Sequence, residues 1–254
     1  MVLMYPPDLK DFLVNGHKVF LKHVSVDCVV FGFHENQLKV LLLKWKDQGG
    51  WCVPGGFVKR TDTLEDAAAR VLKERTGLDK IYLSQFQAFS ALDREKGKKP
   101  FKVPGIKTTW YMERFISVGF WALVEYSKVR PQLDWLTEDC RWFDVHEIPK
   151  MIYDHRLIVT KALEALRHSL INHPIGYNLL PEKFTMPELQ RLYETILDRR
   201  LDRRNFQKKM LSLNILERLK EKKNVISKKP PFLYRFDRKK YHHAMKEGLM
   251  VGGF

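Results

Sequence analysis

The sequence predicts an α+β fold for the first two thirds of the chain, followed by a smaller, strongly basic domain. Its 254 residues, 44% of them hydrophobic, suffice for two domains that each bury a core. Segments typical of strands and of helices are mixed over residues 1–172 without a regular βαβ order. Pro and Gly then mark a connection, after which the composition changes. We therefore expect domains at 1–172 and 184–254, joined by a linker at 173–183.

Apolar periodicity and turn signals define the elements of the first domain. Two β-branched or apolar runs, Ser25–Phe33 and Leu38–Lys44, flank a polar turn and predict a β-hairpin. Two further strand segments and two helical segments follow from the same reasoning. They are Arg114–Tyr126 and Cys140–Val145 for the strands, and Leu64–Thr76 and His155–Ile171 for the helices. This mixture favours an α+β or α/β/α arrangement over a doubly wound sheet.

The second domain begins with a helix whose start is encoded locally. Thr185 and Glu188 form a capping box, and apolar residues at helical spacing follow. After a turn at 198–202, Asp202 fits the N-cap of a second helix at Arg203–Leu213. Two strands joined by a lysine-rich loop come next, at Ile215–Leu219 and Phe232–Phe236. Helix, short turn, helix and basic hairpin is the order of a winged helix-turn-helix.

Positive charge is concentrated in the second domain. The chain has a formal net charge of +15, from 45 Lys and Arg against 30 Asp and Glu. From residue 181 onward, 19 basic and 9 acidic residues give +10, which leaves +5 for the first 180 residues. A basic module attached to a nearly balanced one favours a polyanionic partner, with nucleic acid first among these. A solvated, solubilising surface is the alternative that charge alone leaves open.

Several classes of protein are excluded. No uninterrupted apolar run reaches the roughly 20 residues of a membrane-spanning helix, and the amino terminus lacks the order of a secretion signal. We therefore expect a cytoplasmic protein that has no membrane partner. Cys28, Cys52 and Cys140 are scattered, and their spacing suggests neither a disulfide framework nor a zinc site.

The stretch from Trp51 to Leu78, WCVPGGFVKRTDTLEDAAARVLKERTGL, has the pattern of a loop, a helix and a second loop. Gly55 and Gly56 permit a tight turn, Thr63 can cap the helix, and Gly77 can supply a left-handed C-cap. The stretch resembles the Nudix box, whose pattern is GX5EX7REUXEEXGU, with U a bulky apolar residue. When the two glycines of the pattern are placed on Gly56 and Gly77, the spacing matches without a gap. This resemblance implies an α/β/α Nudix-like sandwich for the first domain.

The chemistry of this box is eroded. In Nudix hydrolases, glutamates of the box helix bind Mg²⁺, which activates water and clamps the pyrophosphate. Here Asp62 replaces the first Glu, Val71 and Arg75 occupy two later Glu positions, and Glu74 alone remains of REUXEE. An arginine beside the single carboxylate competes for it and repels a cation. We therefore predict no catalytic residue, metal or cofactor, and interpret Arg70 and Glu74 as a surface pair.

The resemblance covers the whole chain. Segments between Gln85 and Phe120 resemble those after the box in ADP-ribose pyrophosphatases, although a basic insertion at 94–113 departs from that family. A Nudix-like domain with an eroded box and a winged helix resembles the Nudix-related transcriptional regulators. This resemblance implies a homodimer, a palindromic operator in double-stranded DNA, and a small-molecule effector. The effector would be ADP-ribose-like or a pentose sugar such as L-arabinose, and Val71 and Arg75 favour the sugar-responsive branch.

The same resemblance assigns two sets of side chains. In a repressor, the helix at Arg203–Leu213 enters the major groove and the wing lysines contact phosphates. The predicted DNA-binding residues are Arg203, Arg204, Asn205, Lys208, Lys209, Lys222, Lys223, Lys228 and Lys229. Arginines suit phosphates or sugar hydroxyls, and aromatic rings can stack on a ligand. The predicted ligand-binding residues are Trp51, Glu74, Phe89, Arg94 and Arg114, of which the two aromatic residues also fit core positions.

Two other functions fit parts of the sequence. A divergent Nudix hydrolase of ADP-ribose or a related nucleoside diphosphate would release AMP or ribose phosphate with Mg²⁺ or Mn²⁺, and Glu74→Gln would abolish this. An RNA-binding Nudix-like protein would prefer single-stranded RNA, although the winged-helix order argues for duplex DNA. The tail after Phe236 receives no role from the sequence.

Overall fold

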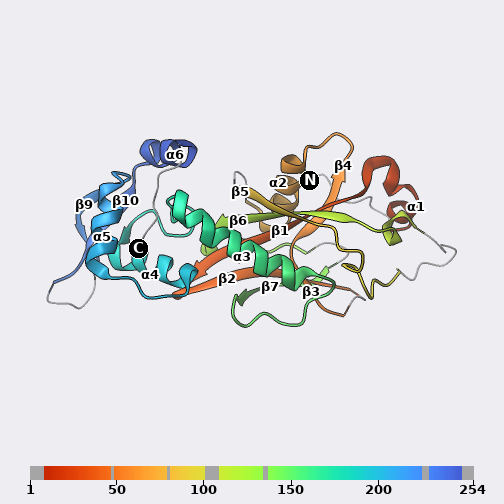
Figure 1. Cartoon of the computed structure of the whole chain (residues 1–254), viewed down its shortest axis with the longest axis horizontal. Helices are drawn as coiled ribbons and strands as arrows, with labels where there is room; N and C mark the ends of the chain where they lie inside the picture. The colour runs from red at the N-terminus through yellow and green to blue at the C-terminus, as the bar shows by residue number, and fades with distance from the viewer. Residues whose placement is uncertain are drawn as a thin grey trace. The chain divides into compact units, whose positions relative to one another are not determined.

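Seven strands form one sheet that carries most of the first unit of the chain (Figure 1). The computed structural model describes residues 9–46, 49–78, 81–100, 109–133, 137–224 and 229–247. The chain divides into two units. The first comprises the chain up to Phe31, Lys39–Leu123 and Lys128–Ala162, and the second comprises Gly32–Leu38, Val124–Ser127 and Leu163–Phe254.

Strand β1 (Phe20–His34) lies at the centre of the sheet. The order is β3-β2-β1-β6-β5, with β4 paired to β1 and β7 paired to β2. The other strands are β2 (Gln37–Trp45), β3 (Trp51–Cys52), β4 (Gly55–Lys59), β5 (Tyr82–Phe89), β6 (Ile116–Val124) and β7 (Thr137–Asp144). The predicted hairpin is confirmed as β1 and β2, but β1 begins five residues earlier than predicted. The middle of β1 is buried without alternation, as expected of a strand covered on both faces.

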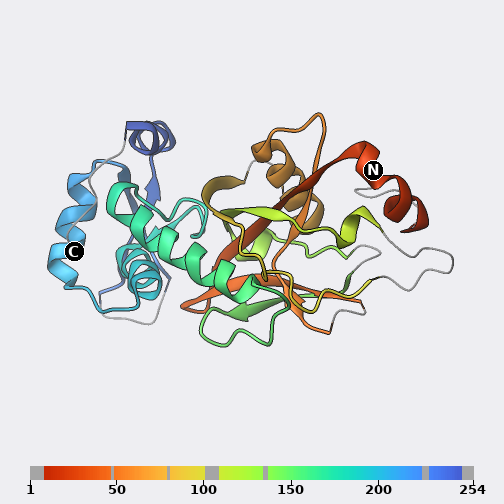
Figure 2. The same ribbon diagram turned by 45° about the vertical axis from the view of Figure 1, so that its right-hand side comes forward.

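Helices cover this sheet on both sides. α2 (Leu64–Thr76) has the predicted bounds and packs against β4, while α3 (His155–Asn172) crosses in front of the strands (Figure 1). Both helices can also be followed in the view turned by 45° (Figure 2). The α/β/α sandwich predicted for the first domain is therefore confirmed. Helix α1 (Leu9–Val19) and strand β5 have no counterpart among the predicted elements.

Helix α1 packs through a close contact with a short 3-10 helix at Trp110–Met112. Phe12 and Gly16 are buried on its inner face, and the Trp110 indole Nε1 donates a hydrogen bond to the Phe12 carbonyl at 2.8 Å. The Trp110 ring also lies 5.2 Å from the Phe12 ring and 4.8 Å from the Phe57 ring, between centroids. Part of the 94–113 insertion thus belongs to the aromatic core of the first unit.

Gly16→Ala is expected to destabilise the protein, although alanine is the better helix former by about 1 kcal/mol. A Cβ at Gly16 would lie 2.7–2.8 Å from three Trp110 ring atoms, so the helix or the indole would have to move. Overpacking of this kind costs about 1–3 kcal/mol. Urea unfolding measures the change. A stabilised Gly16→Ala variant would show that α1 does not rest on Trp110.

The second unit contains a three-stranded sheet and helices in the order of a winged helix. Its sheet order is β8-β10-β9. Its elements are β8 (Phe184–Thr185), α4 (Met186–Leu197), α5 (Arg203–Ser212), β9 (Leu216–Lys222), β10 (Phe232–Phe236) and α6 (Arg238–Glu247). The capping box of Thr185 and Glu188 is formed, and Asp202 caps α5, as predicted. Tyr193 of α4 packs edge-on against Phe206 of α5, with centroids 5.4 Å apart.

Two parts of the second unit differ from the sequence prediction. Strand β9 extends to Lys222, three residues past the predicted end, so Lys220 and Lys222 lie on a strand rather than in a loop. Helix α6 occupies part of the tail that had no assigned role, and it packs through Tyr241 and Ala244. No helix in the described ranges has the length and apolar character required to cross a bilayer.

Candidate effector pocket and DNA-binding surface

The box stretch forms the predicted loop, helix and loop. Thr63 and Asp66 make a reciprocal capping box at the start of α2, and Gly77 ends the helix with φ 72°. Gly55 faces Asp27 across the β4–β1 pairing, where a Cβ would lie 2.5 Å from the Asp27 Oδ1 atom. Glycine at this position therefore leaves room for a buried carboxylate on the neighbouring strand.

Arg70 of the box pairs with Asp62 and not with Glu74, the partner predicted for it. Arg70 donates from Nε and Nη2 to Asp62 Oδ2 at 3.1 and 2.8 Å, and from Nη2 to the Phe57 carbonyl at 2.9 Å. The interpretation of Arg70 and Glu74 as a pair is wrong, because the preceding loop folds back and brings Asp62 to the guanidinium.

The two lost glutamate positions of the box face the interior. Val71 is fully buried and Arg75 is 3% exposed. Among the residues that the structure describes, no group of three His, Cys, Asp or Glu side chains is placed to hold a metal ion. Glu74, the remaining carboxylate of REUXEE, therefore belongs to no cluster of metal ligands in these ranges.

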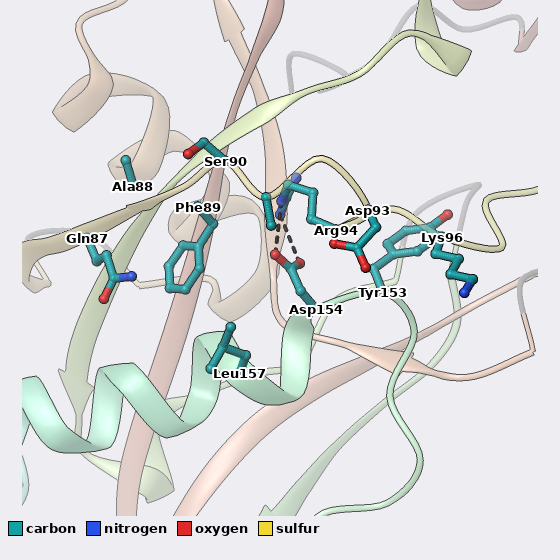
Figure 3. A pocket seen from close by; sticks show the side chains of 11 residues that line it. Gln87, Ala88, Phe89, Ser90, Asp93, Arg94, Lys96, Tyr153, Asp154 and Leu157 are labelled. Atoms are coloured by element: carbon teal, nitrogen blue, oxygen red, sulfur yellow. Dashed lines mark hydrogen bonds and ion pairs between the residues drawn. The ribbon is translucent and has the colours of Figure 1, made fainter.

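A pocket of about 500 Å³ opens between the end of β5 and the start of α3 (Figure 3). Its walls come from residues within 87–96 and 153–157, all in the first unit. Phe89 and Arg94, two of the predicted ligand-binding residues, are among them. A volume of this size is typical of sites for small organic ligands. This pocket is the candidate effector site.

Arg94 lies at the base of the pocket, where two carboxylates hold its guanidinium. Nε and Nη2 donate to the two oxygens of Asp154 at 3.0 and 3.1 Å (Figure 3). Nη2 also donates to Asp27 Oδ2 at 3.3 Å. Ser117 Oγ donates to the same Asp27 oxygen at 2.5 Å. Asp27, Arg94 and Ser117 are each at most 6% exposed. A buried charge cluster therefore ties β1, β6 and the start of α3 to the pocket.

Asp27, Ser117 and Asp154 are absent from the predicted ligand-binding residues. One signal was present, since Asp27 is the single charged residue in the apolar run SVDCVVFGF. Burial raises the pKa of Asp154, and the nearby Arg94 guanidinium offsets part of that rise. Burial likewise lowers the pKa of His155, whose Nδ1 accepts a hydrogen bond from the Val53 amide at 3.2 Å.

The other three predicted ligand-binding residues lie outside the lining of this pocket. Arg114 adjoins it, because its Nη2 donates a hydrogen bond to the carbonyl of the lining residue Ser90. Trp51 packs edge-on against Phe143, with centroids 4.6 Å apart, and Glu74 is on α2. The predicted set is therefore divided between the pocket, its rim and other parts of the first unit.

Described residues of the 94–113 insertion help to line the space beside Gly55 and Gly56. Only about 60 Å³ remains there, next to Lys98 and Tyr111. Lys98 Nζ bonds Glu95 Oε1 at 2.8 Å and lies 4.3 Å from the Tyr111 ring centroid. Burial lowers the pKa of Lys98, although Glu95 opposes that shift. A space this small is far below the roughly 300 Å³ of typical ligand sites.

The basic residues of α5 lie on its exposed side. Phe206 and Met210 are buried against the rest of the unit, so the opposite side of the helix faces outward. Arg203, Arg204, Asn205 and Lys208 are exposed, and Lys209 is half-buried. The side chains predicted to bind DNA thus form one surface at the beginning and middle of α5.

The wing is the hairpin of β9 and β10, and its lysines differ in exposure and in pairing. Lys222 is exposed, and its Nζ lies 5.0 Å from the centroid of the Phe232 ring. The central guanidinium carbon of Arg218 lies 3.6 Å from the same centroid. Lys223 is instead ion-paired with Glu188, the N3 residue of the α4 capping box. Lys229 is exposed, and the prediction for Lys228 falls outside the described residues.

The sandwich and the winged helix together define a two-domain DNA-binding protein of the Nudix type. The profile of the NUDIX domain matches residues 21–163, and the profile of the NrtR DNA-binding winged helix domain matches residues 176–236. The chain therefore belongs to the Nudix family, and its second domain is an NrtR-type winged helix. The family and fold predicted from the sequence are confirmed.

Curated relatives and solved structures agree with this assignment. The "ADPR responsive transcriptional repressor NtrR" of Acinetobacter baylyi is 27% identical over 220 residues, 84% of this chain and 81% of that protein. An ADP-ribose pyrophosphatase of Methanocaldococcus jannaschii is 28% identical over 155 residues, 60% of this chain and 77% of that protein. Shewanella oneidensis NrtR complexed with a 27mer DNA has a TM-score of 0.71 at 24% identity, covering 87% of this chain and 96% of that chain. That likeness shows the fold.

Proposed function

We propose that the protein is a transcriptional repressor whose DNA affinity is set by a metabolite bound in the Nudix domain. One observation carries the proposal: a Nudix domain without a cluster of metal ligands in its described residues shares a chain with a basic winged helix. The Acinetobacter relative, a repressor responsive to ADP-ribose, supports it. The effector is ADP-ribose-like or a pentose sugar, and the protein acts in the cytoplasm, where DNA and metabolites meet.

The DNA contacts follow from the exposed surface of α5. Its first turns carry Arg204 and Asn205, whose donors suit base edges in the major groove, while Lys208 suits a phosphate. Binding as a homodimer would place one α5 in each half of a palindromic operator. The effector must then bind the DNA-incompetent arrangement more tightly than the competent one.

Retention of genomic fragments tests the proposal. The protein is incubated with sheared DNA of its source at near-physiological salt, and the retained fragments are sequenced. Enrichment of a few fragments that share a palindrome is expected, and the effector should release them. Uniform retention that disappears with modest added salt would show nonspecific charge and overturn the proposal.

Lys222→Gln and Lys223→Gln are expected to differ, although they are neighbours and remove the same charge. Lys222 is available to a phosphate, so its loss should reduce the slope of log affinity against log salt by about 0.9. Lys223 is bound to Glu188, so its loss should leave that slope unchanged and lower the melting temperature. Salt titration of operator binding and thermal unfolding measure both. Equal slopes for the two variants would contradict the assignment of Lys222 to DNA binding and of Lys223 to the internal ion pair.

We further propose that hydrolysis of nucleoside diphosphates is lost. The buried Val71 and Arg75 in place of glutamates, and the small volume beside Gly56, support this. The pyrophosphatase relative provides the reason to test it. ADP-ribose is incubated with Mg²⁺ or Mn²⁺, and AMP is measured. Release of AMP that Glu74→Gln abolishes would establish the hydrolase instead.

A further inference from the structure

Arg94, one of the two arginines predicted to contact an effector, is already paired with carboxylates inside the protein. Its Nε and Nη2 contact Asp154 and Asp27, and Nη1 lies 3.5 Å from the Phe115 carbonyl. A ligand could take this guanidinium only by leaving a buried carboxylate without its partner, which is costly. The charged groups that meet a ligand must therefore come from elsewhere in the pocket.

Asp93 and Lys96 are the two lining side chains with unused charge. Both are exposed, and within the described ranges neither side chain forms an ion pair or hydrogen bond. A turn holds them three residues apart, because the Lys96 amide donates to the Asp93 carbonyl at 2.9 Å. In the view of Figure 3 both lie on one side of the pocket and Phe89 and Leu157 lie on the other. The pocket thus has a charged side and an apolar side.

These two groups demand different chemistry from one ligand. A carboxylate is an acceptor only, and its two oxygens suit two neighbouring hydroxyl groups. An ammonium has three donors and no acceptor, so it suits an anion. A neutral pentose would satisfy Asp93 and leave Lys96 unused, while inorganic phosphate alone would satisfy Lys96 and leave Asp93 unused.

We infer that Asp93 and Lys96 determine the specificity of this pocket, for a ligand that carries both a vicinal diol and a phosphate. Sugar phosphates and nucleoside diphosphate sugars belong to this class, and free pentoses do not. Phe89 and Leu157 supply the apolar wall for the uncharged remainder of the ligand. The inference rests on the proposed function in taking this pocket as the effector site, and it selects between the two effector classes.

Calorimetric titration of the full chain tests this directly, with ADP-ribose, D-ribose 5-phosphate, D-ribose and L-arabinose as probes. The two phosphorylated ligands should bind more tightly than the two free sugars. Asp93→Asn and Lys96→Gln should each weaken ADP-ribose binding by about ten- to a hundredfold, the effect of one hydrogen bond to a charged group. Lys96→Gln should also reduce the preference for D-ribose 5-phosphate over D-ribose, whereas Asp93→Asn should keep it.

Two exposed first-unit residues outside the pocket serve as matched controls, Glu147→Gln and Lys18→Gln. Both should bind like the unaltered protein, and melting temperatures show that every variant is folded. Unchanged affinity in both pocket variants, equal binding of L-arabinose and ADP-ribose, or no binding of either phosphorylated ligand would each overturn the inference. Retention of operator fragments is measured separately, so a failure of the repressor proposal remains distinguishable.

Discussion

Arg204→Gln combined with Lys208→Gln is expected to weaken operator binding by about 2–4 kcal/mol, because a base contact of Arg204 contributes about 1–3 kcal/mol and a phosphate contact of Lys208 adds to it. Both side chains are exposed on α5, one helical turn apart, while Phe206 and Met210 anchor the opposite side. Because the anchoring residues are untouched, the fold should persist. Fluorescence anisotropy with an operator duplex, repeated at several salt concentrations, measures the loss.

The salt dependence distinguishes the loss of phosphate contacts from the loss of base contacts. Each lost phosphate contact should reduce the slope of log affinity against log salt by about 0.9, whereas a lost base contact should relax sequence preference. Lys18→Gln combined with Lys22→Gln removes the same charge from exposed sites in the first unit and is the control. If the control loses as much affinity as the α5 pair, net charge and not the helix surface governs binding.

Arg94→Met is expected to destabilise the protein by about 3–5 kcal/mol at neutral pH, the typical cost of removing one partner from a buried ion pair. Asp27 and Asp154 would be left close together with no compensating cation. Arg94→Lys should recover only part of the loss, because an ammonium cannot reproduce the two-bond contact to Asp154. Urea unfolding of the three proteins measures the differences.

The pH dependence of the Arg94→Met variant has a defined sign. Burial raises the pKa of Asp154 in the folded protein, and removing Arg94 should raise it further. A carboxyl with a raised folded pKa favours folding below its unfolded pKa, and that stability is lost as pH rises through the folded pKa. Acidification from pH 7 toward pH 4.5 should therefore narrow the gap between variant and unaltered protein. If the stability difference instead widens on acidification, the ionised Asp154 carboxylate is not the cause of the instability of the variant.

Much of the architecture could be read from short stretches of sequence. The capping boxes at Thr63 and Thr185 and the C-cap at Gly77 formed as predicted, because their partners lie within four residues along the chain. The order of winged-helix elements followed from the same local signals. Helix α1 escaped prediction because its packing partner, Trp110, is far away in the sequence and lies in the insertion.

The candidate sites were less readable. Arg94 was predicted from its residue type as a ligand contact, but its buried partners come from β1 and the start of α3. Lys223 looked equivalent to Lys222 until the wing placed it against Glu188. Whether a charged side chain can bind a ligand depends on whether another residue already neutralises it. The spacing of residues along the sequence does not reveal such a partner.

The sequence by itself determined the family, the two-domain order and the basic character of the second domain, since motif spacing, capping and charge balance are properties of neighbouring residues. Only the tertiary structure decided which charges remain available. Asp27, Arg94 and Asp154 meet because strand pairing and helix packing bring distant segments together in a buried environment. There, desolvation makes pairing obligatory, and Asp93 and Lys96 are left as the charges that can meet a ligand.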